Sequence, residues 1–578
     1  MAPTDQLQEV KIMLHGTAAS EGIGIGKVML IEEHSLEYTP RTVTDTEAES
    51  QRFKAAVDAF CYNTEKQAEN LRSSAGEKEA EILAGHIQII KDPYLSGEIE
   101  KLIADGQCAE SALEHMCDMF IAMFSAADDE LTKQRAADVR DIKSGVLGIL
   151  LGVNEIKVSD AQKGTVLVAR ELTPSVTAGI VKENIAGIIT ETGGTTSHSA
   201  ILARALEIPA VLSVEGVASS LKNGDTVVVD GSEGAVIVNP DDNTVAEYSK
   251  KRDAFLAERK ELENYRGRET KSASGEAYEL FCNIGKPEDA VKAVDADGEG
   301  VGLFRTEFLF MDRTSIPTED EQFEAYKKAA LILKGKSLII RTLDIGGDKD
   351  IPYLGLEKEE NPFMGFRAIR YCLKNRELFK SQIKAILRAS AFGDIKIMFP
   401  LITTMDELRE GKKLVAECKA DLRNMGINFN ENIQVGVMVE TASAAVIADM
   451  LAKEADFFSI GTNDLTGYTM ACDRGNNDVS YLYSPLQPSV LRMIKRTIEC
   501  GVQNGISVGM CGEAAANKLM IPLLISFGLT EFSVSAPSVL NVRKIISTWT
   551  KEEADKVTAK VLEMSTQQEI VEYLKSVV

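Results

Sequence analysis

Eight β-rich runs alternate with longer helical stretches between residues 271 and 578 of this 578-residue chain, and their order constrains the fold more than any other feature. Each run is five or six residues long and has the character of a β-strand. Eight strand–helix units in succession predict a TIM barrel. The predicted strands are 278–283, 300–304, 337–341, 395–399, 434–439, 456–460, 506–510 and 531–535.

Polar residues follow several of these strands, at the end where a barrel builds its functional site. Alone, an arginine is ordinarily a surface residue, and a buried cysteine is ordinarily a small hydrophobe. Gathered at one face, arginines offer donor pairs for phosphate and carboxylate oxygens, and two carboxylates can hold Mg²⁺. The set predicts a site for a small metal-chelating anion with phosphate and carboxylate groups, a description that phosphoenolpyruvate meets. Its members are Arg305, Arg341, Asp344, Arg367, Glu440, Asn463, Asp464, Arg474 and Cys511.

A second chemical pattern lies at residues 193–204, Gly-Gly-Thr-Thr-Ser-His-Ser-Ala-Ile-Leu-Ala-Arg, which follow a predicted strand and open a helix. Backbone N–H groups at a helix start are free to bind an anion. His198, in the first turn, therefore lies where a phosphoryl group would be stabilised. A histidine that merely begins a helix is the alternative for this pattern taken alone.

The residues around this histidine have a β/α pattern. Short apolar runs at 27–31, 166–169, 187–190, 227–230 and 235–238 are separated by turn glycines and predict one compact β/α domain. The glycine-rich segment before the first run precedes a strand rather than a helix, which excludes a dinucleotide-binding loop, and we interpret it as a turn.

An acidic helical block interrupts this domain. Residues 44–144 contain 21 Asp and Glu against 11 Lys and Arg, and Phe53, Val57 and Phe60 recur at helical spacing. The capping-box spacing from Thr44 to Glu47 predicts the helix start, and helical patterning continues to about residue 151. Such a block is ordinarily a solvated bundle, and a docking surface for a basic protein is the functional alternative. We expect His86 and His115 within it to be satisfied helix residues.

Composition excludes several classes of function. A net charge of −24 argues against a nucleic-acid binder, which needs a basic face. No apolar run approaches the roughly 20 residues of a membrane span, and the first residues lack the order of a signal peptide. Nine cysteines without a C-x-x-C pair indicate neither zinc nor disulfides. We therefore expect a cytoplasmic protein with no nucleic-acid or membrane partner.

Taken together, the motifs identify a family. Gly-Gly-x-Thr-Ser-His at 193–198, Gly-Leu-Phe-Arg-Thr-Glu-Phe-Leu-Phe at 302–310, Arg-Thr-Leu-Asp-Ile-Gly-Gly-Asp-Lys at 341–349 and Gly-Met-Cys-Gly-Glu at 509–513 span most of the chain. In these motifs the chain resembles Enzyme I of the bacterial phosphoenolpyruvate:sugar phosphotransferase system.

The resemblance implies a role for each site residue. It implies that His198 is phosphorylated and that Cys511 is the acid that protonates the leaving enolate. It also implies Mg²⁺ as cofactor. The implied metal ligands are Glu440 and Asp464, and the implied substrate-binding residues are Arg305, Arg341, Arg367, Asn463, Asp464 and Arg474.

The same resemblance assigns the domains. Residues 1–36 and 152–243 are expected to form the phosphohistidine β/α domain, and 37–151 the inserted helical domain that binds the phosphocarrier protein HPr. A connecting helix is expected at 244–270, with a cap at Thr244. Residues 271–578 are expected to form the α/β TIM barrel that binds phosphoenolpyruvate and pairs with a second copy in a homodimer.

Two other functions remain open at this point. A dikinase or synthase would share the histidine and the barrel, but it also needs a nucleotide-binding domain, for which no residues remain. A regulatory protein that only senses phosphoenolpyruvate is disfavoured, because Cys511 and both metal carboxylates are present.

Overall fold

The computed structural model describes residues 12–31, 36–74, 77–126, 130–153, 158–172, 176, 180–194, 197–311, 313, 315–346, 351–357, 359–474 and 476–578. The chain divides into two compact units, residues 1–259 and 260–578. In the part of the chain that the structure describes, no helix is long and apolar enough to cross a membrane.

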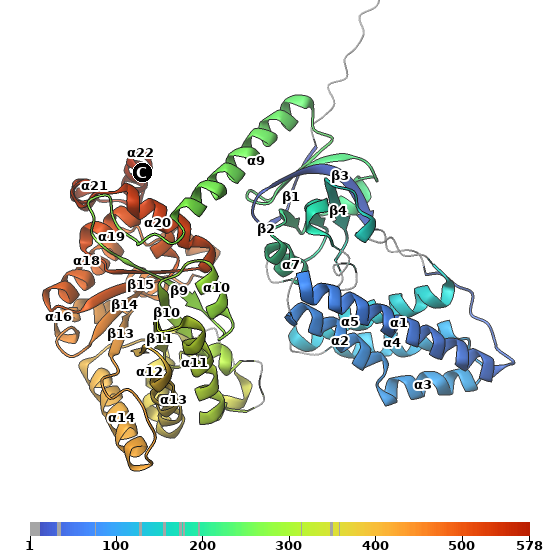
Figure 1. Ribbon diagram of the computed structural model, residues 1–578, viewed down its shortest axis with the longest axis horizontal. Helices are drawn as coiled ribbons and strands as arrows, with labels where there is room; N and C mark the ends of the chain where they lie inside the picture. The colour runs from blue at the N-terminus through green and yellow to red at the C-terminus, as the bar shows by residue number, and fades with distance from the viewer. Residues whose placement is uncertain are drawn as a thin grey trace, which may run out of the picture. The chain divides into compact units, whose positions relative to one another are not determined.

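The second unit is a closed barrel of eight parallel strands with helices around it (Figure 1). The predicted TIM barrel is therefore confirmed, and each strand end differs from its prediction by at most one residue. The strands are β9 (Glu279–Ile284), β10 (Gly300–Arg305), β11 (Ser337–Arg341), β12 (Ile395–Phe399), β13 (Val435–Val439), β14 (Phe457–Gly461), β15 (Ser507–Cys511) and β16 (Glu531–Val534).

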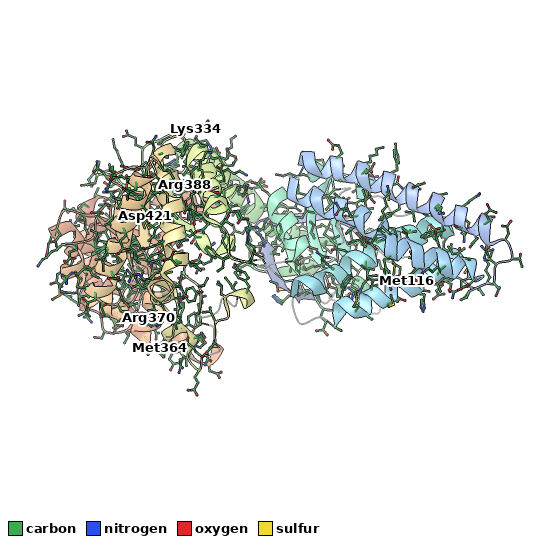
Figure 2. The ribbon with its side chains drawn as sticks, turned by 90° about the horizontal axis from the view of Figure 1, so that it is seen from below. Met116, Lys334, Met364, Arg370, Arg388 and Asp421 are labelled. Carbon is green, nitrogen blue, oxygen red and sulfur yellow. The ribbon has the colours of Figure 1, made fainter. Side chains whose placement is uncertain are left out.

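The helices of this unit bury one face against the strands and expose the other. Between the two faces, Arg388 of α13 (labelled in Figure 2) is partly buried, because its guanidinium pairs with Glu319 (2.6 Å) and lies 4.3 Å from the ring centre of Phe323. The helices are α10 (Asp289–Asp295), α11 (Glu319–Leu333), α12 (Ala368–Lys374), α13 (Arg376–Ala389), α14 (Met405–Asn424), α15 (Ala442–Val446), α16 (Ala448–Leu451), α17 (Thr462–Met470), α18 (Pro488–Gln503), α19 (Ile521–Phe527), α20 (Val539–Thr548), α21 (Lys551–Glu563) and α22 (Gln567–Val577).

The amino-terminal end of the barrel encloses a carboxyl group, that of Glu531. A Cβ atom at Gly302 would lie 2.4 Å from its Oε1, so glycine is needed there to make room for the side chain. Among the described residues Oε1 has no hydrogen-bond partner. Burial, together with the charge of Glu279 and against that of Lys396, raises the pKa of Glu531 to about 8. The side chain is therefore a neutral acid at neutral pH.

This neutral acid predicts how the stability of the barrel depends on pH. Between the ordinary glutamate pKa of 4.5 and about 8, the folded chain holds a proton that the unfolded chain has lost, so stability falls as pH rises. The slope is at most ~1.4 kcal/mol per pH unit. Glu531→Gln should remove this fall. The difference between the melting temperature of the variant and that of the wild type should therefore increase, in favour of the variant, from pH 5 to pH 8. The control Glu552→Gln, at an exposed position, should show the same dependence of melting temperature on pH as the wild type. If Glu531→Gln also showed the wild-type dependence, the prediction would be contradicted.

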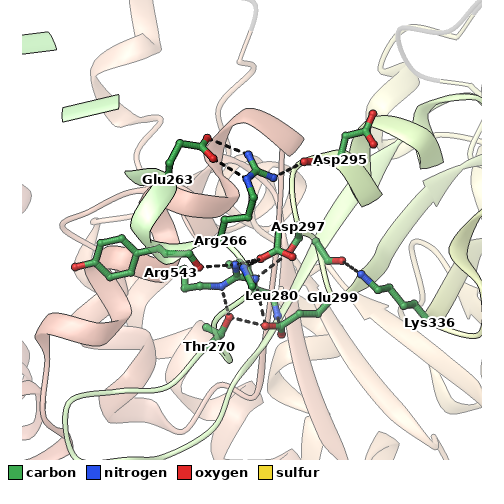
Figure 3. Close-up of polar contacts among 12 residues, drawn as sticks. Glu263, Arg266, Thr270, Leu280, Asp295, Asp297, Glu299, Lys336 and Arg543 are labelled. Carbon is green, nitrogen blue, oxygen red and sulfur yellow. Dashed lines mark hydrogen bonds and ion pairs between the residues drawn. The ribbon is translucent and has the colours of Figure 1, made fainter. Parts of the chain in front are cut away.

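A buried arginine fixes the segment that enters the barrel. The guanidinium of Arg543, in α20, donates to the carbonyl of Tyr265 (3.1 Å), to Oγ1 of Thr270 (3.0 Å) and to the carbonyl of Asp297 (2.8 Å). It also pairs with the carboxylates of Asp297 and Glu299 (Figure 3). Because Arg543 is only 1% exposed, these bonds anchor the chain between the connecting helix and β9 to the barrel.

Removing this arginine should destabilise the barrel. Arg543→Met leaves two carboxylates without their partner and should lower the free energy of unfolding by about 3 kcal/mol. Arg266→Met is the matched control, because Arg266 pairs with Glu263 (2.7 Å) from an exposed position and should cost less than about 1 kcal/mol. Denaturant unfolding of the full chain measures both changes, and equal losses would show that burial of Arg543 adds nothing.

The first unit contains an eight-stranded sheet with the order β1-β8-β7-β3-β4-β5-β6-β2. Five of its strands were predicted, and β1, β2 and β6 were not. The strands are β1 (Ile12–His15), β2 (Thr17–Ser20), β3 (Ile23–Ile31), β4 (Thr165–Ala169), β5 (Ile185–Thr190), β6 (Ala210–Leu212), β7 (Thr226–Asp230) and β8 (Ala235–Val238), and helices α7 (His198–Leu206) and α8 (Val217–Ser220) accompany them.

The interpretation of the glycine-rich segment as a turn is wrong, because this segment forms β1, β2 and the start of β3. A Cβ atom at Gly24 would lie 2.0 Å from the carbonyl oxygen of Ala186, and one at Gly26 would lie 2.0 Å from that of Gly164. The glycines therefore allow two backbones to approach closely within the sheet.

The helical block lies between β3 and β4 in the sequence, and these two strands pair in parallel from Lys27↔Thr165 to Ile31↔Ala169. The expected insertion is confirmed. Within this block Asp92 caps α3 by accepting from the N–H of Tyr94 (2.9 Å). The block consists of α1 (Thr46–Ser74), α2 (Glu77–Ile90), α3 (Pro93–Ala104), α4 (Ala109–Ser125) and α5 (Glu130–Leu151).

Two predicted helix caps are wrong, the first by one residue and the second by three. Helix α1 begins at Thr46, where Asp45 rather than Thr44 accepts from the N–H of Ala48 (3.0 Å). The connecting helix α9 (Asp242–Leu262) likewise begins before Thr244, whose N–H donates to Asp241 (2.7 Å). In each case an aspartate within three residues of the expected threonine takes the capping position.

The two histidines of the helical block differ in burial. His86 is 1% exposed, and its Nε2 lies 3.3 Å from the carboxylate of Asp138, so it is a satisfied helix residue as expected. His115 lies in α4 and is exposed.

Candidate functional site

The carboxyl ends of the barrel strands bring the predicted polar residues to one face, which we call the barrel mouth. Arg305 ends β10, Arg341 ends β11 and Cys511 ends β15, because each is the last residue of its strand. Glu440 follows β13 directly, and Asn463 and Asp464 lie in the first turn of α17. Parallel strands end on the same side of a barrel, so strand position alone gathers these side chains.

Two buried arginines form the centre of the mouth. Arg341 is 7% exposed, and its Nη2 lies 2.6 Å from Oε1 of Glu307 and 3.1 Å from Oδ2 of Asp344. Arg367 is 3% exposed, and its Nη2 lies 2.7 Å from Oδ1 of Asp344 and 3.2 Å from Oδ2 of Asp464. Asp344 therefore bridges the two guanidinium groups and fixes their separation.

These carboxylates determine the charge of the arginines. Burial acts to lower the pKa of Arg341, but Glu307 and Asp344 outweigh it, so the pKa lies above its usual value. Burial also opposes charge on Arg367, and Asp344 and Asp464 again raise its pKa. Both side chains are permanently charged, and they remain donors for an incoming anion.

A third arginine joins this group through an aromatic ring. The guanidinium carbons of Arg367 and Arg474 each lie 5.7 Å from the centre of the Phe363 ring. The hydroxyl of Tyr468 accepts from Nη1 of Arg367 (3.2 Å) and donates to the carbonyl of Phe363. The ring and the hydroxyl therefore hold two cationic groups from different loops near each other.

The remaining two predicted substrate residues are more open. Arg305 is exposed, and its guanidinium carbon lies 5.1 Å from the centre of the Phe308 ring. Asn463 is half-buried, and its carbonyl accepts from the hydroxyl of Tyr483 (3.0 Å).

Glu440 is a buried acid that faces other acids. It is 2% exposed, and its Oε1 accepts from the N–H of Leu401 (2.6 Å). Leu401 has φ of 53°, a backbone conformation that costs energy for a branched side chain and that aims this N–H at the carboxylate. Burial first, then the charges of Asp464 and Asp344, raise the pKa of Glu440 to about 8.

Glu440 and Asp464 are the pair that could hold a metal ion. Their charges interact strongly enough to raise the pKa of one of them, and a cation between them would remove this repulsion. Across the described residues no group of three or more His, Cys, Asp or Glu side chains is arranged around one point. Two carboxylates fit Mg²⁺, which binds through one or two carboxylates together with water and substrate oxygens.

Cys511 has the properties of a proton donor. It is 4% exposed, and burial raises the pKa of its thiol to about 12. The thiol therefore keeps its proton at neutral pH.

His198 is the first residue of α7, in the first unit. Ser197 caps this helix, because its Oγ accepts from the N–H of Ala200 (3.3 Å). Gly193, with φ of 107°, turns the chain between β5 and α7, and its carbonyl accepts from the hydroxyl of Ser213 (2.6 Å). A capped helix start preceded by a glycine turn matches the local structure predicted for residues 193–204.

Comparison with known proteins identifies the family. Residues 259–550 match the family model described as PEP-utilising enzyme, PEP-binding domain; residues 161–234 match the mobile domain and 15–135 the N-terminal region of such enzymes. A Bacillus subtilis protein named phosphoenolpyruvate-protein phosphotransferase is 46% identical over 98% of this chain and 99% of its own length. The chain belongs to the phosphoenolpyruvate-protein phosphotransferase family.

Other members of this family are similarly close. The phosphoenolpyruvate-protein phosphotransferase of Listeria innocua is 45% identical over 97% of this chain and 98% of that protein. Among solved structures, an NMR solution structure of an Enzyme I protein covers 42% of this chain and 99% of that chain, with 37% identity and a TM-score of 0.39.

Several residues of this phosphotransferase site were not predicted from the sequence. Glu307 lay within a recognised motif, but its role as a partner of Arg341 depends on the barrel register. Tyr468 and Leu401 had no signal in the sequence, because one acts through its hydroxyl on a distant loop and the other through its backbone. Ser459, which contacts Cys511, lies within a predicted strand, and nothing in the sequence distinguishes it from an ordinary buried strand residue.

Proposed function

We propose that this chain transfers the phosphoryl group of phosphoenolpyruvate to its own His198, releases pyruvate, and passes the phosphoryl group to the phosphocarrier protein HPr. The observation that carries the proposal is the pair of buried arginines, Arg341 and Arg367, which share Asp344 at a barrel mouth that also presents the protonated thiol of Cys511. The proposal is supported by membership of the phosphoenolpyruvate-protein phosphotransferase family, since one relative of that name is 46% identical over 98% of the chain.

The arginines account for substrate binding. Phosphoenolpyruvate carries a phosphate and a carboxylate, and each offers oxygens for planar guanidinium donors. Arg305, Arg341 and Arg367 hold the phosphate and carboxylate, with Arg474 beside Phe363 closing the site. Asn463 and Asp464 complete the substrate-binding set as an amide and a carboxylate from the start of α17.

The chemistry follows from these groups. An imidazole nitrogen of His198 attacks phosphorus, the bond between phosphorus and the enol oxygen breaks, and its electrons remain on the leaving enolate. The enolate carbon then takes the proton of the Cys511 thiol and becomes the methyl group of pyruvate. The arginines neutralise charge on the transferred group throughout.

Magnesium is the proposed cofactor, held by Glu440 and Asp464. When bound, it would neutralise phosphate charge and orient the phosphoryl oxygens. The buried Glu440 and its repulsion by Asp464 fit this role, because an ion lowers the energy of two facing carboxylates.

The domains of the two units have different proposed functions. We assign residues 1–36 and 152–243 to the phosphohistidine domain, 37–151 to HPr binding, 244–270 to the connection, and 271–578 to phosphoenolpyruvate binding and dimerisation. Helix α9 buries only Thr244 and Tyr248, so it is a solvated connection about which the histidine domain can move between the barrel and HPr.

The partners follow from surface chemistry. The excess of acidic residues in the helical block suits a basic partner. Exposed apolar side chains in segments after barrel strands suit a second copy of the chain; they include Met364 (66% exposed, Figure 2), Val446 (51%) and Tyr481 (71%). All nine cysteines are free thiols, which supports a reducing, cytoplasmic location.

Replacing the acceptor histidine tests the reaction. His198→Ala should abolish labelling by phosphoenolpyruvate that carries labelled phosphate, because no other group would accept the phosphoryl. Wild-type label should be acid-labile and alkali-stable. Full-length protein with His115→Ala, an exposed histidine of α4, is the matched control and should label fully.

The same assay separates the two other functions. Pyruvate should be released continuously only when HPr is present to accept the phosphoryl group. A requirement for nucleotide would indicate a dikinase or synthase, and the absence of pyruvate would indicate a sensor. Full labelling of His198→Ala would mean that another residue is the acceptor.

Metal binding tests the two carboxylates independently of activity. With Mn²⁺ as a paramagnetic probe, Glu440→Gln should weaken binding by at least about tenfold, because one of two ligands is lost. Wild-type affinity should rise with pH up to about 8, since the raised pKa of Glu440 means that the ion must displace a proton.

The control for this experiment is a second buried acid in the same barrel. Glu531→Gln, at the opposite end, should bind Mn²⁺ like the wild type. If Glu440→Gln bound Mn²⁺ with wild-type affinity and wild-type pH dependence, Glu440 would not be a metal ligand.

A further inference from the structure

A buried serine approaches the sulfur of Cys511 from inside the barrel. Ser459 lies in the middle of β14 and is 0% exposed. Its hydroxyl donates to Sγ of Cys511 over 3.3 Å. In the strand register Gly461 pairs with Cys511 and Ser459 pairs with Gly509, so Ser459 lies two residues deeper than Cys511. The hydroxyl therefore contacts the sulfur on the side away from the mouth.

Among the described residues, the thiol has one further polar contact. Sγ of Cys511 lies 3.8 Å from the carbonyl oxygen of Ile460, to which the thiol donates. The sulfur otherwise belongs to an apolar cluster inside the barrel, which includes Leu303, Met438 and Phe457. Within this cluster an unsolvated thiolate would be strongly disfavoured, because few dipoles are available to stabilise it.

We infer that Ser459 is a positioning residue for the proton-donating thiol: its hydroxyl holds the sulfur below the mouth and donates to the thiolate that remains after the proton has left. This inference rests on the proposed role of Cys511 as the acid. A fixed sulfur limits the directions in which the S–H bond can point, and a preorganised donor needs no rearrangement when charge develops.

The role of the hydroxyl is defined by the proton balance of the step. As the bond between phosphorus and oxygen breaks, its electron pair stays on the enolate, and phosphorus bonds to the His198 nitrogen. The terminal carbon of the enolate takes the proton from sulfur, and the electron pair of the S–H bond remains on sulfur. The Ser459 hydroxyl then donates to a negatively charged acceptor, which strengthens its hydrogen bond. A proton from solvent restores the thiol after pyruvate leaves.

A nearby serine provides a matched control. Ser533, in β16, is also 0% exposed and lies opposite Cys511 in the register, but its hydroxyl donates to Oδ1 of Asn283 (2.7 Å). Ser533→Ala removes a buried hydroxyl of the same barrel without removing a donor to the sulfur. It should leave turnover within about twofold of the wild type, because the lost hydroxyl bonds to Asn283 and not to the sulfur.

Ser459→Ala should reduce kcat about tenfold, since one hydrogen bond to a charged group is lost, while KM for phosphoenolpyruvate stays within about twofold. The protonation should also lose its stereochemical control. Phosphoenolpyruvate stereospecifically deuterated on its terminal carbon, turned over in tritiated water, should give chiral methyl pyruvate with the wild type and largely racemic product with Ser459→Ala. If the serine had only a structural role, its replacement would not change the ratio of the two enantiomers of the chiral methyl group.

A double-mutant cycle distinguishes this inference from the proposed function. If Ser459 acts through the thiol, Ser459→Ala should add nothing to the loss caused by Cys511→Ala. If Cys511→Ala leaves turnover unchanged, the proposed acid is wrong and the role of Ser459 fails with it. If Cys511→Ala is slow but Ser459→Ala turns over with wild-type kcat and stereochemistry, only the role of Ser459 is overturned. Should Ser459→Ala fail to fold, Ser459→Cys, whose thiol is a weaker donor, should give an intermediate loss by the same measurements.

Discussion

The sharing of Asp344 between two buried guanidinium groups is the interaction on which the barrel mouth depends. Arg341 and Arg367 are almost without solvent, and a buried cation without a partner costs several kcal/mol. Asp344 lies 3.1 Å from one and 2.7 Å from the other, and Glu307 and Asp464 complete the pairing. Because these carboxylates already fix the arginines, an anion that binds them would cost little rotamer entropy.

The same arrangement explains why acids are so dense at this mouth. Each carboxylate stabilises an arginine, but Glu440, Asp464 and Asp344 also repel one another, as the raised pKa of Glu440 records. The mouth is therefore a set of opposed charges that is only partly balanced. A cation bound between the acids and an anion bound to the arginines would each balance part of this charge, so the binding of one would favour the binding of the other.

The barrel could be predicted from the sequence because both of its signals are local. Runs such as 435–439 are apolar on both faces. A residue that ends a barrel strand, such as Arg341 or Cys511, lies at the mouth because of its position in that strand alone. Pairings across the barrel are not local. The bond between Ser459 and Cys511 depends on the register of two strands, and the bridge from Tyr468 to Phe363 depends on the path of a loop.

The errors in the first unit have the same cause. Gly24 and Gly26 suggest a turn because glycine is common in turns, yet their function becomes visible only when Ala186 and Gly164 lie against them. The helix starts at Thr46 and Asp242 were misplaced because aspartate and threonine both cap helices, and the choice between neighbours depends on the approach of the preceding chain.

The pairing of β3 with β4 has a consequence for how the first unit folds. Two adjacent parallel strands require a crossover connection, and here the entire helical block serves as that connection. The strands can pair only after the intervening chain has brought Ile31 and Ala169 together, which is a non-local and slow event. The block has its own apolar core, built around residues such as Phe53, Leu113 and Ile142, so it can become compact first and shorten the loop that remains to be closed. The order of folding would then run from the inserted segment outward to the sheet that surrounds it in the sequence.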